Sequence, residues 1–156
     1  MRAPFVFAAL LVLPVGCAKN ADSDDDEDAP VDCSTQVADT FVVGLDHKGS
    51  GGMLDFQMMS ADPAPPARGN NTWVIQIMSM NAGIDAAPLD GASITVTPYM
   101  PAHGHGTPVV AEVTDMGSGA YQLSPVNLWM PGVWQTTIAV TTPTPDSAVF
   151  SFCLPD

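Results

Sequence analysis

The stretch VWQTTIAVTT, residues 133–142, alternates between larger apolar side chains and smaller or polar ones. The first set consists of Trp134, Thr136, Ile138 and Val140, and the second of Gln135, Thr137, Ala139 and Thr141. Successive side chains of a strand point to opposite faces of its sheet. The stretch therefore predicts an antiparallel β-strand with one buried face and one solvent-facing face.

Seven further segments rich in strand-forming residues are separated by clusters of Gly, Pro, Asn and Asp. They cover residues 40–46, 53–60, 72–80, 92–100, 107–114, 119–126 and 148–154. Consecutive prolines remove backbone donors, so residues 61–71 are predicted to form a loop. No segment shows a helical period. Turn signals every 10 to 12 residues or so favour an all-β fold, an immunoglobulin-like antiparallel β-sandwich of seven or eight strands.

The N-terminal segment has the features of a secretory signal, with Arg2 followed by an apolar run over residues 5–13. The run is too short to span a bilayer, which takes about 20 apolar residues. Cys17 follows small residues and resembles the lipobox cysteine of bacterial lipoproteins, although Pro14 stands where leucine is usual. This resemblance implies a lipid on Cys17 that anchors the chain to a membrane without spanning it. Ordinary signal cleavage, which leaves a soluble periplasmic protein, is the alternative.

The segment after Cys17 contains seven acidic residues up to Asp32 and few apolar ones, which predicts an extended acidic tether. From Cys33 onward, ten acidic residues face only Lys48 and Arg68, a net charge of 2 − 10 = −8. Nucleic acid is excluded as a partner because phosphate needs cationic contacts.

The predicted domain organisation has three parts. Residues 1–16 form a signal peptide, residues 17–32 a lipidated cysteine with its linker, and residues 33–156 one β-sandwich domain.

Cys33 and Cys153 lie near the two ends of the predicted domain. In an oxidising compartment such a pair predicts one disulfide, with two buried thiols as the alternative. Closing a loop of about 120 residues stabilises a fold by roughly 4 to 5 kcal/mol in the chain-entropy model.

Three stretches occur in the order found in one known family. They are NTWVIQIM (71–78), APLDGASITVTPYMPAHGHGTP (87–108) and GSGAYQLSPVNLWMPGVWQTTIAV (117–140). Together, over about residues 70–142, they resemble the YtkA-like domain, a small exported β-sandwich of bacterial lipoproteins related to FixH-type modules. The resemblance implies the sandwich fold, and it places the family's suspected binding of copper or another metal at Met100, His103, His105 and Met130.

The chemistry of these four residues suits copper. Residues two apart in extended backbone project to the same side, so His103 and His105 can face one ion while the glycines beside them let the loop curl. Imidazole binds copper, zinc and nickel, and thioether sulfur selects Cu(I). Two histidines with Met100 or Met130 therefore favour copper, provided that the loop of Met130 lies beside the histidine loop.

Each residue also has a purely structural interpretation. The histidine pair can be a solvated turn, Met100 continues a core-facing strand pattern, and Met130 belongs to a Met-Pro-Gly turn. Trp129 and Trp134 fall on either side of that turn, and we expect one in the core and one partly exposed. An exposed tryptophan can contact a sugar or a protein.

Catalysis has little support in the sequence. No nucleophile stands with an adjacent base and an orienting group, and Asp46, His47 and Ser50 are too local in sequence to form a triad. His47 is interpreted as a surface residue. We therefore expect a non-enzymatic, lipid-anchored protein of the bacterial cell envelope that binds copper as a carrier or accessory. Ala18 after the lipidated cysteine favours the outer membrane. The alternative is an interaction module that binds an envelope protein or a glycan.

Overall fold

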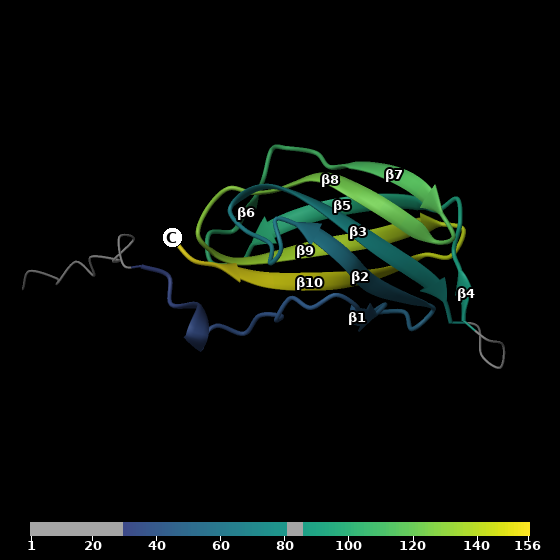
Figure 1. Ribbon diagram of the computed structural model, residues 1–156, viewed down its shortest axis with the longest axis horizontal. Helices are drawn as coiled ribbons and strands as arrows, with labels where there is room; N and C mark the ends of the chain where they lie inside the picture. The colour runs from purple at the N-terminus through teal and green to yellow at the C-terminus, as the bar shows by residue number, and fades with distance from the viewer. Residues whose placement is uncertain (1–29, 81–85) are drawn as a thin grey trace, which may run out of the picture.

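A computed structural model describes residues 30–80 and 86–156, which form two antiparallel sheets packed face to face (Figure 1). The strands are β1 (Leu45–Lys48), β2 (Leu54–Asp62), β3 (Gly69–Ser79), β4 (Ala87–Pro88), β5 (Ser93–Met100), β6 (His105–Gly106), β7 (Glu112–Gly117), β8 (Ala120–Leu128), β9 (Gly132–Thr142) and β10 (Asp146–Leu154). The first sheet has the order β1-β2-β3-β8-β7, with β4 beside β3, and the second has the order β10-β9-β5-β6. The predicted immunoglobulin-like antiparallel β-sandwich is confirmed.

The core lies between the two sheets and follows the alternation seen in the sequence. Along β9, the side chains of Trp134, Thr136, Ile138 and Val140 are buried, as the pattern predicts. The largest fully buried side chains come from both sheets and are Trp73, Tyr121, Phe56, Trp134 and Phe150. Apolar burial of this kind is the main force that holds the sheets together.

Three sequence-based boundaries are wrong. Strand β1 covers residues 45–48, so only Leu45 and Asp46 of the expected strand 40–46 lie in it. Before them, the Gly44 N–H donates a single backbone hydrogen bond to Met58 of β2, and Asp39 is bonded to Ser151 of β10. Residues 107–111 form no strand, since they cross from β6 in one sheet to β7 in the other. The loop expected at 61–71 is shorter, because β2 continues to Asp62 and β3 begins at Gly69.

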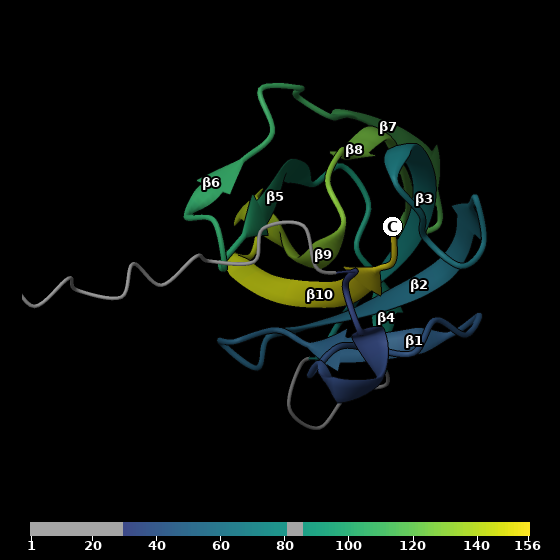
Figure 2. The same ribbon diagram turned by 90° about the vertical axis from the view of Figure 1, so that its left-hand side faces the viewer.

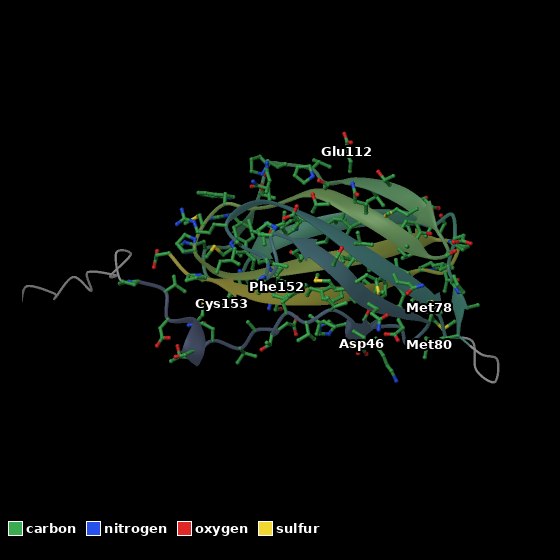
Figure 3. The ribbon with its side chains drawn as sticks, viewed as in Figure 1. Asp46, Met78, Met80, Glu112, Phe152 and Cys153 are labelled. Carbon is green, nitrogen blue, oxygen red and sulfur yellow. A yellow bond between two sulfur atoms is a disulfide. The ribbon has the colours of Figure 1, made fainter. Side chains whose placement is uncertain are left out.

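One side of the sandwich is sealed by the chain that precedes β2, and we call it the closed side. The η1 turn (Cys33–Thr35) is tied to β10 by the predicted disulfide between Cys33 and Cys153, which is confirmed (Figure 3). Asp39 then lies along β10, where its N–H donates to the carbonyl of Ser151 and its carboxylate accepts from the Ser151 N–H at 2.7 Å. His47, expected at the surface, is only 31% exposed; it packs edge-on against Phe150 and lies 3.1 Å from the Asp39 carboxylate.

Asp146 fastens the turn before β2 to the start of β10 on this closed side. Its buried carboxylate accepts hydrogen bonds from the N–H groups of Gly51, Met53, Leu54 and Ser147, all between 2.7 and 2.9 Å. Burial alone raises the pKa of Asp146, but the four donors outweigh it and lower the pKa below 3.8. The turn approaches so closely that any side chain at Gly49 would collide with the carboxylate.

The opposite side, which we call the open side, lies where β5 and β7 form the last full strands of their sheets. Here residues 107–111 connect the two sheets and arch away from β5 toward β7 (Figure 2).

The expected signal peptide, Cys17 and residues 18–29 of the tether fall outside the described residues. In the ranges 30–80 and 86–156, no helix has the length and apolar character needed to cross a membrane.

Candidate metal site at the loop end

The histidine loop connects β5 to β6 at one end of the sandwich, which we call the loop end. Met100, the last residue of β5, pairs with His105 in β6. The carbonyl of Met100 accepts from the N–H groups of His103 and Gly104, at 3.2 and 3.0 Å. Gly104 has a φ of +66°, a conformation that glycine adopts without strain. This tight hairpin fixes His103 and His105 on either side of Gly104.

The two imidazole rings lie near each other. Their centroids are 5.7 Å apart, and the ring planes are inclined by 40°. His103 is exposed and His105 is half-buried. Nδ1 of His105 lies 3.1 Å from the carbonyl oxygen of Gly106. A carbonyl only accepts, so this contact needs the proton on Nδ1 and leaves the lone pair on Nε2.

The segment Trp129 to Gly132, which contains the Met-Pro-Gly turn, connects β8 to β9 and contacts the histidine loop. The ring of His105 stacks on Trp129, with centroids 5.5 Å apart and an interplanar angle of 19°. The indole N–H of Trp134 donates to the Met130 carbonyl at 2.9 Å and closes this turn. The structure thus brings both loops together, an adjacency that the sequence left open.

Met100 serves the core and also reaches the loop end. It is 2% exposed and belongs to the hydrophobic core. Its terminal methyl group packs on Gly132, where any side chain would collide with it, and Gly132 also has a φ of +118°. Met100 and His103 both line a small hollow of about 190 Å³, which we call the Met100 hollow. The other lining residues are Val31, Gln36, Ala102, Pro131, Gly132 and Val133.

The four predicted ligands are therefore distributed over one small region. Met100 and His103 share the hollow, and His105 lies beside Trp129. Met130 is half-buried and packs against the core without lining the hollow. Among the described residues, no three His, Cys, Asp or Glu side chains are grouped to hold a metal. A site here would therefore need methionine sulfur or oxygen ligands in addition to the two imidazoles.

Two features of the site were missed from the sequence. Val31 and Gln36 wall the Met100 hollow although they are more than 60 residues from it in the chain. The disulfide was the available signal, because it ties the segment around Cys33 to the last strand. The stacking of His105 on Trp129 had no signal in the spacing of the residues.

Trp129 and Trp134 differ in burial, as expected. Trp134 is fully buried, and Trp129 is 47% exposed. The exposed Trp129 also lines an open groove of about 860 Å³ formed by the 63–69 loop, together with Pro155 and Asp156. Arg68, one of two cationic side chains after residue 32, lines the same groove.

Comparison with known proteins gives one match. No curated protein and no solved structure matches the chain. The YtkA-like family model matches residues 53–139, a span that covers the histidine loop, the Met-Pro-Gly turn and six of the eight longer strands in whole or in part, and more than half of the chain. The resemblance drawn from the spaced motifs is therefore confirmed: the chain belongs to the YtkA-like family.

Proposed function

We propose that this protein binds copper at the loop end and is a lipid-anchored, non-enzymatic component of the bacterial cell envelope. The observation that supports copper binding is the convergence of two imidazoles and a buried thioether on neighbouring loops. The lipid anchor rests on the lipobox-like position of Cys17, and Ala18 after it favours the outer membrane.

The separation of the two imidazoles suits ligation of one ion. A metal–nitrogen bond of about 2.0 Å puts a ring centroid roughly 3 Å from the metal, so two ligating rings have centroids about 4.5 to 6 Å apart. The observed separation of 5.7 Å falls in this range. The His105 Nδ1 contact with a backbone carbonyl is also the outer contact that metal-binding histidines usually make. His105 would therefore bind through Nε2.

Met100 favours the reduced ion. Thioether sulfur is a soft ligand that prefers Cu(I), and the Met100 hollow is lined by both this side chain and His103. A set of two imidazoles and one thioether would hold Cu(I), while the two imidazoles with oxygen ligands would hold Cu(II). His103 is exposed, so an ion held there can pass to another protein, which suits a carrier or accessory role.

Copper titration of the full chain, purified in mild detergent, tests the proposal. Cu(II) is added in air, and Cu(I) is added with a competing chelator and a reductant too mild to open the disulfide. We expect one copper per chain. The His103→Ala/His105→Ala variant should lose at least about tenfold in affinity, because two ligands are removed. The His47→Ala variant is the matched control, since His47 lies on the closed side.

Unchanged binding in the double variant, or no binding by the parent, would contradict the proposal. The alternative, an interaction module for an envelope protein or a glycan, would then be favoured. The exposed Trp129 in its proline-lined groove is the surface that such a glycan would contact. Chelators would not affect binding of that kind.

The role of Met100 is tested by Met100→Leu, which nearly conserves volume and so is tolerated in a core. We expect weaker Cu(I) binding and unchanged Cu(II) binding. Met58→Leu, at a fully buried methionine in β2, is the control for the effect of a methionine-to-leucine change in the core. Equal Cu(I) affinity in the two variants would remove Met100 from the ligand set.

Membrane anchoring is tested by Cys17→Ala. We expect loss of incorporated radiolabelled fatty acid and release of the protein from the membrane fraction. A variant that stays lipidated would show that Cys17 is not the anchor.

A further inference from the structure

The open side of the sandwich contains a strand edge without a partner strand. β5 pairs with β9 along one edge, but on the other edge β6 pairs only with Tyr99 and Met100. In the described part of the chain, residues 94–97 form no backbone hydrogen bond on this second edge with the 107–111 segment. Their outward N–H and C=O groups are left to solvent.

A groove of about 500 Å³ runs along this edge. One wall is β5, with Ile94, Val96 and Pro98, and the other is the 107–111 segment, with Val109 and Val110. Ile94 and Val96 point toward the core but are only half-buried, and no charged side chain lines the groove. Its volume falls in the range of ligand-binding clefts, about 300 to 1,000 Å³.

The other outer edges of the two sheets are protected. Exposed strand edges template unwanted pairing, and natural proteins block them with charges or covering segments. The edge of β10 is covered by Asp39 and by Ser50, whose N–H donates to the carbonyl of Ser147. β1 carries Asp46 and Lys48, whereas the β5 edge carries only neutral side chains.

β7, the last strand of the first sheet, is protected by charge as well. It carries Glu112 and Asp115, and Glu112 points away from the sandwich (Figure 3). The edge of β5 is thus the one long edge in the described residues that is neither charged nor covered.

We propose that this edge binds one extended segment of a partner protein by strand addition. An extended backbone is the group that matches a row of free N–H and C=O groups, and alternate side chains of the added strand would enter the groove. The added strand would continue the pairing that β6 begins at Tyr99 and would complete the burial of Ile94 and Val96.

Shape and charge define the partner further. Residues 107–111 bound the groove on its far side, so we assign it to a single added strand and not to the edge of a second copy, which would bring a second such wall. The groove is neutral, so residues that enter it must be apolar. The net charge of −8 after residue 32 favours basic residues at the ends of the segment. This proposal does not depend on copper binding.

The test uses a synthetic peptide of four Val-Thr repeats followed by two lysines, labelled for fluorescence anisotropy. Its partner is the full chain in mild detergent. We expect saturable binding and slower hydrogen exchange at the amides of residues 94–97. A second peptide, N-methylated at alternate residues, keeps the side chains and charge but lacks half of the donors. It should bind at least about tenfold more weakly, since strand addition depends on main-chain hydrogen bonds.

Two protein variants locate the binding. Val110→Asp places a charge on the groove wall, and Val110 is 82% exposed, so the fold should tolerate the change. We expect it to weaken peptide binding by about tenfold or more, because the charge would be desolvated. Val37→Asp, at a valine 95% exposed elsewhere, is the matched control and should bind normally.

The proposal would be overturned by no binding of the peptide up to millimolar concentration, by equal binding of the N-methylated peptide, or by equal binding to the Val110→Asp variant. Self-association of the chain that Val110→Asp abolishes would also overturn it, since a second copy would then occupy the groove.

Discussion

The closed and open sides of this sandwich are built from the same kind of strands but differ in how the two sheets are linked and how the strand edges are covered. On the closed side, a disulfide, the Asp39 bridge and the buried Asp146 carboxylate join the two sheets. On the open side, the links are residues 107–111 and a hydrogen bond from Gly91, just before β5, to Asp115 of β7, while the neutral edge of β5 faces solvent. The difference indicates that structural constraint is concentrated on one side, which leaves the other available for binding.

Removal of the disulfide should have the largest effect. We expect the Cys33→Ser/Cys153→Ser variant to lose about 4 to 5 kcal/mol of unfolding free energy, because the closed loop of about 120 residues is opened. Denaturant unfolding measures this loss. Reductant should destabilise the parent and leave the variant unchanged. A loss below about 1 kcal/mol would show that the closed side does not depend on the covalent link.

Asp146→Ala should have the next largest effect. It leaves the buried N–H of Leu54 and the partly buried N–H groups of Gly51 and Met53 without partners, and we expect a loss of about 3 kcal/mol. Asp115→Ala provides the comparison on the open side. Asp115 is exposed and accepts from Gly91 and Gly117, so its loss should cost less than about 1 kcal/mol. Thermal unfolding measures both losses. Similar losses of unfolding free energy in the two variants would contradict the proposed difference between the sides.

Acid should weaken the closed side through the same carboxylate. The pKa of Asp146 is lower in the folded chain than the usual 3.8, so the folded state binds its proton less readily than the unfolded state. Its contribution to stability is therefore present above about pH 4 and is lost as the pH falls below that value. Asp146→Asn should show a shallower loss of stability between pH 4 and pH 2. An identical slope in parent and variant would assign the acid sensitivity to other groups.

The histidine pair should have the smallest effect on stability. His103 is exposed and His105 is half-buried, so we expect His103→Ala/His105→Ala to change the unfolding free energy by less than about 1 kcal/mol without metal. Added copper should raise the melting temperature of the parent and leave that of the variant unchanged. A large destabilisation without metal would mean that the stack of His105 on Trp129 has a structural function.

Much of the fold could be predicted because it depends on local pattern. The alternation in residues 133–142 gave the correct buried face of β9, and the cysteine count gave the correct disulfide. Segments 40–44 and 107–111 failed for one physical reason. Both contain two valines and are suited to a strand, but a strand needs a continuous hydrogen-bonded partner. Residues 107–111 belong to no strand pair, and residues 40–44 make one backbone hydrogen bond to a strand, from Gly44 to Met58 of β2.

The candidate site was predictable in its residues and not in its arrangement. The spacing of His103 and His105, and the order of the motifs around them, pointed to this end of the sandwich and to the YtkA-like family. Their environment depends on groups distant in sequence. Trp129 stacks on His105, Gly132 receives the methyl group of Met100, and Gln36 walls the hollow.

The sequence by itself determined the sandwich class, the disulfide and the family, because periodicity, cysteine number and motif order are properties of the chain alone. Only the tertiary structure decided that the two loops touch, that Met100 is both core and hollow lining, and that one strand edge stays open. These features arise when strands far apart in sequence become neighbours, and the pairing of strands depends on packing of the whole core and not on any local pattern.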